Sequence, residues 1–215
     1  MTTSESIAKL ILELRESGIT DTAVLRAIER VPREAFVPAA FRARAYENVA
    51  LPIGHGQTIS QPYVVARMTA ALELTDRHMV LEIGTGSGYQ AAVLARLARR
   101  VFTVERHRAM LNAAEERFRQ LRLHNITCRF GDGTKGWPEQ PTFDRIIATA
   151  AAPVIPDILL QSLVPGGILV APVGADKRDQ VLLRVRRGET DFTAEELGMV
   201  RFVPLVAGLP RGAGH

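Results

Sequence analysis

The sequence is poor in cysteine, because Cys128 is the only one among 215 residues. A single thiol cannot form an intramolecular disulfide, which favours a reducing compartment. Long hydrophobic runs are missing too, since no stretch approaches the roughly 20 apolar residues that a bilayer-spanning helix needs. The N-terminal residues include Glu5, Lys9, Glu13 and Arg15, so we expect no signal-peptide core there. These absences predict a cytoplasmic location and no membrane partner.

Concentrated charge of one sign is also absent, although the formal net charge is +4. The cations are almost all arginines and alternate with acids from Arg15 to Arg211, with the densest group around Arg100 and Arg106. A diffuse positive balance indicates a soluble surface rather than a nucleic-acid-binding stripe. We therefore expect no nucleic-acid partner. A content of 47% hydrophobic and 23% charged residues is typical of a folded domain.

Metal-ligand patterns are missing as well. The histidines at positions 55, 78, 107 and 124 do not have the spacing of a metal site, so we expect no metal. No His–Asp pair that could serve as a general base is evident either. Any catalysis must therefore depend on other groups.

The first part of the chain predicts a helical cap. Apolar residues at helical spacing indicate helices over about 7–14 and 24–31, which end near Gly18 and Pro32. A tract rich in proline and glycine follows, and a third helix is expected over 63–74, with Pro62 in its first turn.

From residue 78 the pattern alternates between strands and helices. Strands are expected over 78–83, 101–104, 126–130, 143–149 and 168–173, with helices over 90–99, 109–122 and 155–164; Pro165-Gly166-Gly167 should end the last helix. Repeated β-α-β units predict a doubly wound, mostly parallel α/β sheet with helices on both faces. Two further strands, over 180–187 and 199–206, should form an antiparallel edge. We expect a single domain over 1–215, with a cap (1–75), a core (76–175) and edge strands (176–210).

A glycine loop follows the first core strand. Gly84, Gly86 and Gly88 stand where an open α/β sheet binds nucleotides, between a strand and a helix N-terminus. A dinucleotide fingerprint needs a glycine at position 89, which is Tyr89 here. Glu82 would repel a pyrophosphate but could help hold the ammonium and sulfonium cations of S-adenosylmethionine. The loop therefore favours S-adenosylmethionine as the cofactor.

Two more carboxylates fall at strand ends. Glu105 lies 21 positions after Gly84, where it could accept hydrogen bonds from both ribose hydroxyls. Asp132, beside Gly133, ends the next strand and should lie in reach of the adenine amino group. Either carboxylate alone could be a solvated loop residue or a helix cap. Their common register with the glycine loop favours a cofactor site.

Several segments together resemble the protein-L-isoaspartate O-methyltransferase family. They are Gly56-Gln57-Thr58-Ile59-Ser60-Gln61-Pro62, residues 81–89, Gly131-Asp132-Gly133-Thr134-Lys135-Gly136-Trp137, Thr149-Ala150-Ala151-Ala152-Pro153, Ile155-Pro156 and Pro165-Gly166-Gly167. The glycine loop is common to many methyltransferases, whereas the tract from Gln57 to Pro62 is specific to this family. The likeness runs in order from about Val31 to Pro204, and the tail after Leu209 looks unrelated.

The resemblance implies a Rossmann-like methyltransferase that repairs damaged proteins and peptides. It would transfer a methyl group from S-adenosylmethionine to the free α-carboxylate of L-isoaspartyl residues. By similarity Ser60 is the catalytic residue, and Thr58, Gln61, Pro62 and Val206 border the substrate. Thr58 would also touch the cofactor, together with Glu82, Gly84, Gly86, Ser87, Gly88, Glu105, Asp132 and Gly133.

The expected chemistry needs few catalytic groups. An α-carboxyl group has a pKa of about 3.5, so it is already a nucleophile at neutral pH. A hydroxyl such as that of Ser60 can hold one carboxylate oxygen and aim the other. Ser60 could instead be a helix N-cap before Pro62. We expect the peptide to bind as an extended segment between residues 52–62 and 202–206.

Three alternatives remain open at this point. One is a methyltransferase for a small molecule or for a different protein site, which would share the loop and Glu105 but not depend on Ser60. Another is a cofactor-binding module without catalysis that uses its arginines for RNA or protein. The third is a nicotinamide oxidoreductase, against which Glu82 and Tyr89 count. The sequence predicts no oligomeric state.

Overall fold

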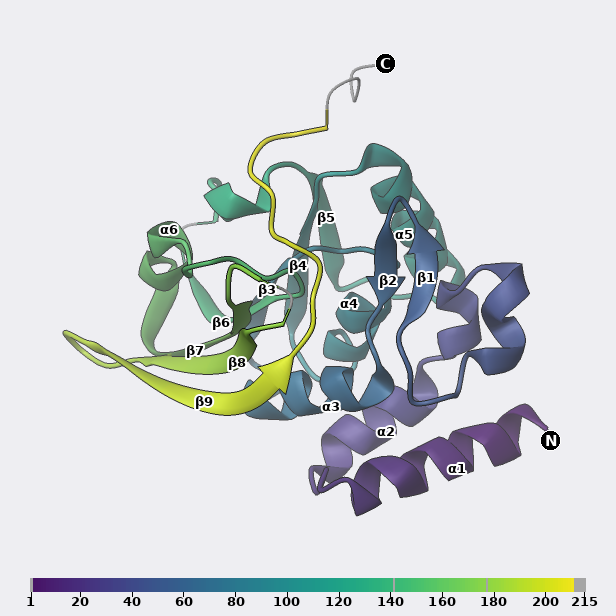
Figure 1. Ribbon diagram of the computed structural model, residues 1–215. Helices are drawn as coiled ribbons and strands as arrows, with labels where there is room; N and C mark the ends of the chain where they lie inside the picture. The colour runs from purple at the N-terminus through teal and green to yellow at the C-terminus, as the bar shows by residue number, and fades with distance from the viewer. Residues whose placement is uncertain (1, 141, 177, 211–215) are drawn as a thin grey trace.

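The computed structural model describes residues 2–140, 142–176 and 178–210. Within them a seven-stranded sheet has the strand order β5-β4-β3-β6-β7-β8-β9 (Figure 1). Its strands are β3 (Met79–Ile83), β4 (Arg100–Glu105), β5 (Ile126–Phe130), β6 (Phe143–Ala148), β7 (Leu163–Val173), β8 (Gln180–Arg187) and β9 (Phe192–Val200). The first five run parallel, and β8 and β9 are added antiparallel. The order reverses at β3, which places a ligand-binding crevice at its carboxyl end.

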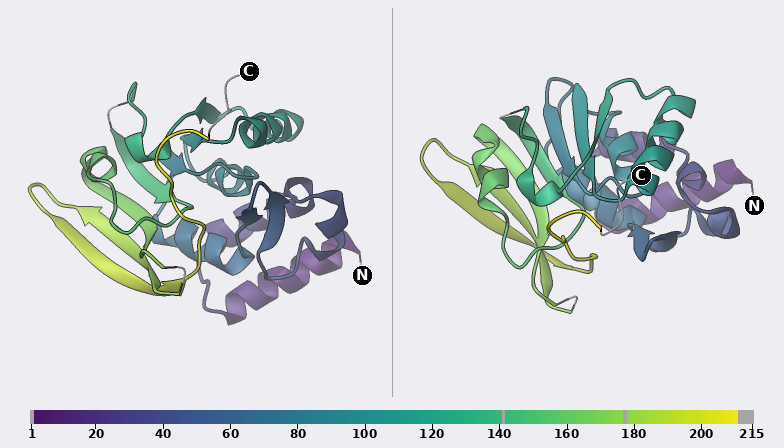
Figure 2. Two further views of the ribbon diagram at one scale, coloured as in Figure 1. Left: turned by 45° about the horizontal axis from the view of Figure 1, so that its top comes forward. Right: turned by 90° about the horizontal axis from the view of Figure 1, so that it is seen from above.

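Helices cover both faces of the sheet, as the sequence predicts. On one face lie α1 (Thr3–Glu16), α2 (Thr22–Arg30), α3 (Pro62–Ala71), α4 (Tyr89–Leu94) and α5 (Arg108–Gln120). On the other face lies α6 (Asp157–Gln161). A hairpin of β1 (Leu51–Gly54) and β2 (Gln57–Ile59) projects beside the sheet, and the short helices η1 (Arg33–Phe36), η2 (Ala39–Arg44) and η3 (Gly133–Lys135) fill connections (Figure 2).

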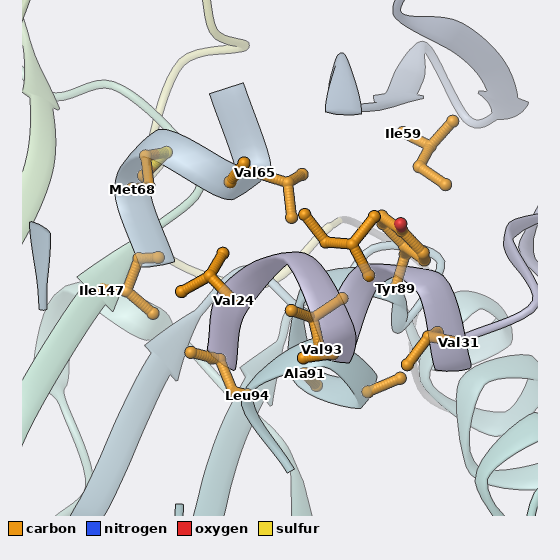
Figure 3. Packing of buried hydrophobic residues seen from close by; sticks show 14 of the residues in the cluster. Val24, Val31, Ile59, Val65, Met68, Tyr89, Ala91, Val93, Leu94 and Ile147 are labelled. Carbon is orange, nitrogen blue, oxygen red and sulfur yellow. The ribbon is translucent and has the colours of Figure 1, made fainter. Parts of the chain in front are cut away.

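The core forms where the helical cap meets the sheet. Figure 3 shows Val24 of α2, Val65 and Met68 of α3, and Val93 of α4 pointing toward one another. Successive strand residues alternate between the two faces, because side chains in a strand have a period of two. Val80 therefore joins the core under the cap, whereas its neighbour Leu81 joins the core under α6. This packing fixes the cap against the carboxyl end of β3.

Two predicted helices are shorter than expected. The helix predicted over 90–99 ends at Leu94. The helix predicted over 155–164 shrinks to α6, and β7 begins at Leu163, so Pro165-Gly166-Gly167 lies inside a strand instead of ending a helix. The reason is a bulge, where the β6–β7 register shifts and a Cβ on Gly167 would lie 2.7 Å from the Val164 carbonyl oxygen.

The predicted antiparallel edge is present in β8 and β9, but the bounds predicted for its last strand, 199–206, are wrong. The strand is β9, which ends at Val200 and is exposed over most of its length, so its residues carry no hydrophobic alternation to reveal it. Residues 201–208, which we call the strap, leave the ribbon and run between the sheet and the β1–β2 hairpin (Figures 1 and 2). The Ala151 N–H donates to the Val203 carbonyl (2.8 Å), and the Leu205 N–H donates to the Ala151 carbonyl (2.6 Å). Residues 211–215 of the tail lie outside the described residues.

Candidate active site

The glycine loop connects β3 to α4 in a conformation that requires glycine. Gly84, Gly86 and Gly88 all have positive φ. A Cβ on Gly84 would lie 2.5 Å from the Thr149 hydroxyl oxygen, and a Cβ on Gly88 would lie 2.7 Å from the Phe118 ring. One side of the loop is therefore tightly packed against the protein, and its other side borders a cavity.

Glu105 holds this loop from the neighbouring strand. Its carboxylate accepts hydrogen bonds from the Gly86 N–H and from the His107 N–H, each at 2.9 Å. The side chain is 6% exposed and borders the cavity at the loop. An acceptor at this position can bind ribose hydroxyls, as the sequence predicts, and it also positions the loop.

Two cavities meet in front of the loop. The inner one, the loop cavity, has a volume of about 90 Å³ and is bounded by the glycine loop, β2, Glu105 and the strap. The outer one, the outer cleft, has a volume of about 570 Å³ and lies between α3, the end of β9 and the strap. Four residues border both, namely Thr58, Ser60, Thr149 and Val203. These residues define the junction between the two spaces.

Ser60 lies at the junction and does not cap α3. The N-cap position belongs to Gln61, whose own side chain makes no capping hydrogen bond. Gln61 is held by Asn48, whose carbonyl accepts from the Gln61 side chain at 2.9 Å and whose side chain accepts from the Tyr63 N–H at 2.9 Å. The alternative role of Ser60 as a helix cap is therefore wrong. Among the hydrogen bonds of the described residues, the Ser60 hydroxyl has no protein partner.

Glu82 has a different setting from the one that the sequence analysis assumed. Its side chain is completely buried, borders neither cavity and accepts a hydrogen bond from the Thr103 hydroxyl. Burial raises its pKa to about 8, helped by the nearby charge of Glu105 and opposed by the Thr103 bond. The argument that Glu82 offers an exposed negative charge to a cation is therefore not supported.

Asp132 also borders neither cavity. One carboxylate oxygen accepts from the Thr134 N–H and hydroxyl, and the other accepts from the Gly208 N–H of the strap at 2.7 Å. Partial burial would raise its pKa, but these hydrogen bonds hold the pKa below its usual value. Gly133 packs on Ile83, where a Cβ would come within 2.5 Å of a side-chain methyl. Asp132 therefore holds the strap in place, and Gly133 packs against the end of β3.

The predicted substrate residues divide between the cleft and its surroundings. Thr58, Ser60 and Gln61 border the outer cleft, whereas Pro62 is buried in the first turn of α3. Val206 is 43% exposed and borders neither cavity.

The strap contributes Val203 to the junction instead. Its backbone is already partly paired, because Phe202 exchanges hydrogen bonds with the Gln180 side chain and Val203 and Leu205 bond to Ala151. A bound peptide would have to use other main-chain groups than these.

Sequence patterns did not single out Thr149 or the three arginines of the outer cleft as site residues, and they indicated Val203 only as part of the segment 202–206. Thr149 follows β6, and its hydroxyl donates to the Gly84 carbonyl at 2.6 Å. Its position at the end of a predicted parallel strand could have indicated it, because the carboxyl ends of parallel strands meet at one edge of the sheet. No local pattern marks the arginines, which come from separate segments.

A first prediction concerns Glu105. We expect Glu105→Ala to weaken binding of S-adenosylhomocysteine by about 1.5–3 kcal/mol, because it removes charge-assisted hydrogen bonds to the ribose and loosens Gly86. Titration calorimetry measures the loss, and Glu115→Ala on the exposed surface of α5 is the matched control. Unchanged affinity, or tight binding of NAD to the unaltered protein, would reject the assignment of the cofactor site.

The fold and the site define an S-adenosylmethionine-dependent methyltransferase, with a glycine loop at the switch point of the sheet and an acidic residue at the end of the next strand. More narrowly, the chain belongs to the protein-L-isoaspartate(D-aspartate) O-methyltransferase family, whose model matches residues 5–209. It is a methyltransferase that acts on isoaspartyl-containing proteins, as the resemblance predicts.

Curated relatives support the family assignment, and solved structures share the fold. The protein-L-isoaspartate O-methyltransferase of Rhodospirillum centenum is 56% identical over 96% of this chain and 94% of the relative. That of Rhodospirillum rubrum is 60% identical over 94% and 93%. A solved protein-L-isoaspartate O-methyltransferase superimposes with a TM-score of 0.85 at 27% identity, covering 94% of this chain and 66% of that longer one. One from Plasmodium falciparum, in complex with S-adenosyl-L-homocysteine, has a TM-score of 0.79 at 24% identity, covering 92% and 97%.

None of the helices among the described residues has the length and hydropathy of a membrane-spanning segment. Across the same residues, no group of three or more histidine, cysteine or acidic side chains could hold a metal ion.

Proposed function

We propose that methyl transfer to the free α-carboxylate of an L-isoaspartyl residue takes place at the junction of the two cavities. The observation that carries this proposal is that Thr58, Ser60, Thr149 and Val203 border both spaces. A cofactor in the loop cavity and a peptide in the outer cleft can therefore meet only there.

The residues around the loop cavity fit S-adenosylmethionine. Gly84 and Gly86 present backbone without side chains, and Glu105 presents a carboxylate that suits ribose hydroxyls. A separate cavity of about 260 Å³ also borders Gly86 and Ser87, together with His55. When bound, the cofactor supplies an electrophilic methyl group on a sulfonium.

The protein's own part in the reaction is to position the substrate. The carboxylate is ionised at neutral pH, with a pKa of about 3.5, so no residue has to remove a proton. The Ser60 hydroxyl has no protein partner among the described residues and can donate to one carboxylate oxygen, which aims the other at the loop cavity. Orientation and exclusion of water can contribute up to about 7–11 kcal/mol in well-aligned systems.

We also propose a setting for this activity. A single thiol and a diffuse positive charge favour a cytoplasmic enzyme that uses damaged proteins, and not nucleic acid, as its substrate. We assign residues 1–75 to the cap, 76–175 to the cofactor-binding core and 176–210 to the edge, within one domain.

A second prediction separates catalysis from stability at Ser60. We expect Ser60→Ala to lower kcat on an isoaspartyl peptide about tenfold, the equivalent of one charge-assisted hydrogen bond. Affinity for S-adenosylhomocysteine and the thermal midpoint should stay unchanged, because Ser60 does not cap α3. Steady-state kinetics and thermal unfolding of the variant test this, with Ser4→Ala in the exposed first turn of α1 as control. Full activity per folded molecule would remove Ser60 from the mechanism.

A further inference from the structure

Among the described residues, three arginines border the outer cleft and no acidic side chain does. They are Arg67, Arg178 and Arg201; the remaining lining is polar at the junction and apolar toward Leu182, Met199 and Phe202. A cavity with several cations and no anion attracts negatively charged ligands. The outer cleft should therefore favour negatively charged ligands, although positive charge is not concentrated on the surface as a whole.

Elsewhere on the protein, arginines pair with glutamates. The ion pairs are Arg44–Glu47, Arg119–Glu116, Arg129–Glu139, Arg184 with Glu73 and Glu195, and Arg186–Glu73. Within the described residues, none of the three cleft arginines has a carboxylate partner of this kind. Asp176 lies close to Arg178 in the chain, but its carboxylate accepts from the Arg178 backbone N–H. The guanidinium groups of the cleft remain available to a ligand.

Arg67 is positioned by the fold. Tyr63 and Arg67 are four residues apart on α3, which places both on the face that borders the cleft. The guanidinium of Arg67 lies against Gly198 of β9, where an added Cβ would be 3.3 Å from one of its nitrogens. Figure 1 shows the end of β9 beside α3. A side chain at position 198 would therefore require this guanidinium to shift slightly.

The carboxylate that is methylated is a poor partner for these arginines. Methyl transfer neutralises it, so an ion pair with it would be stronger in the ground state than in the transition state and would slow the reaction. The neutral Ser60 hydroxyl suits that carboxylate better. The three arginines border the outer cleft but not the loop cavity, so they lie where the flanks of a peptide would bind under the proposed function.

We infer that the outer cleft binds a second carboxylate of the substrate, so that isoaspartyl peptides with an acidic neighbour are preferred. The second carboxylate comes either from a flanking Asp or Glu side chain or from a nearby C-terminus. The inference rests on the proposed function and names the class of substrate that this site favours. It makes Arg67, Arg178 and Arg201 specificity-determining residues.

The experiment compares isoaspartyl hexapeptides that carry Glu or Gln at one of the two positions on either side of the isoaspartyl residue. All have amidated C-termini, and one further pair differs only in a free or amidated C-terminus two residues away. We expect at least one Glu peptide, or the free-acid peptide, to show a kcat/KM about 2- to 5-fold above its neutral partner, as exposed ion pairs allow. The difference should lie in KM and should shrink in 1 M salt, where the screening length is about 3 Å.

The variants identify the residues responsible. The triple variant Arg67→Gln, Arg178→Gln, Arg201→Gln should lose the preference yet still methylate the neutral peptide, whereas Arg99→Gln, which removes one exposed charge elsewhere, should keep it. If the triple variant does not fold, the double variant of the exposed Arg178 and Arg201 replaces it. Equal rates on all peptide pairs, or a preference that survives the substitutions, would overturn the inference. In either case, methylation of the neutral peptide would still uphold the proposed function. Methylation of no isoaspartyl peptide at all would overturn both.

Discussion

An L-isoaspartyl peptide is expected to be methylated at least about 100-fold faster than the aspartyl peptide of the same sequence. The two residues have the same atoms and the same charge, and they differ in which carboxylate is free and in a backbone lengthened by one methylene. Charge in the cleft, including that of its arginines, cannot tell them apart. Discrimination must come from the place that the carboxylate reaches at the junction.

The geometry of the junction explains the size of this effect. At the junction, Ser60 lies in the chain between β2 and α3, Thr149 follows the carboxyl end of β6, and Val203 belongs to the strap. A carboxylate misplaced by about 1 Å can lose on the order of 100-fold in rate. Labelled S-adenosylmethionine and paired peptides measure the ratio, with free isoaspartate as a third substrate that should be inactive because it has no flanks to bind. Equal labelling of the pair, or preferential labelling of a small metabolite, would reject the isoaspartyl assignment and leave a methyltransferase of another specificity.

Replacing Glu82 with glutamine should change how the stability of the protein depends on pH. In the cofactor-free protein, burial holds the Glu82 pKa at about 8, above the ordinary value of 4.5. Between these two values the folded state keeps a proton that the unfolded state releases. The free energy of unfolding therefore falls as pH rises, with a slope that approaches about 1.4 kcal/mol per pH unit.

The sign of this effect is opposite to that of a carboxylate in a salt bridge. The contribution of Glu82 is fully present below pH 4.5 and is lost as pH rises toward 8. Glu82→Gln cannot release the proton, so the variant should become more stable than the unaltered protein as pH rises through this window. Denaturant unfolding of both proteins at four pH values from 5 to 8 gives the difference directly. Parallel curves would show that Glu82 is ionised in the folded protein.

Local patterns in the sequence were sufficient for the main elements of the fold. The spacing of apolar residues predicted α1, α2, α3 and α5, and the alternation of strands and helices predicted the parallel strands of the core. The glycine loop was also readable, because Gly84 and Gly88 need positive φ and leave no room for a side chain. Family membership followed from the tract at Gln57–Pro62 and is confirmed by the comparisons.

The errors arose where one sequence signal fits two structures. Pro165-Gly166-Gly167 reads as the end of a helix, but glycines at a bulge give the same signal inside β7. The apolar residues around Val203 resemble a strand in sequence, but the ladder of β9 ends at Val200, because its partner β8 begins at Gln180. The residues that follow pair with Ala151 instead. The register and the ends of a strand depend on the strands that pair with it, which lie elsewhere in the sequence.

By itself, the sequence determined the class of fold, the place of the cofactor loop and the family, since each of these depends on residues close together in the chain. Only the tertiary structure decided that Glu82 is buried beneath the loop while Glu105 faces the cavity, because desolvation depends on what packs around each carboxylate. It also decided that Arg67, Arg178 and Arg201 border one cleft. They come from α3, the β7–β8 connection and the strap, and folding alone brings those segments together around the site of methyl transfer.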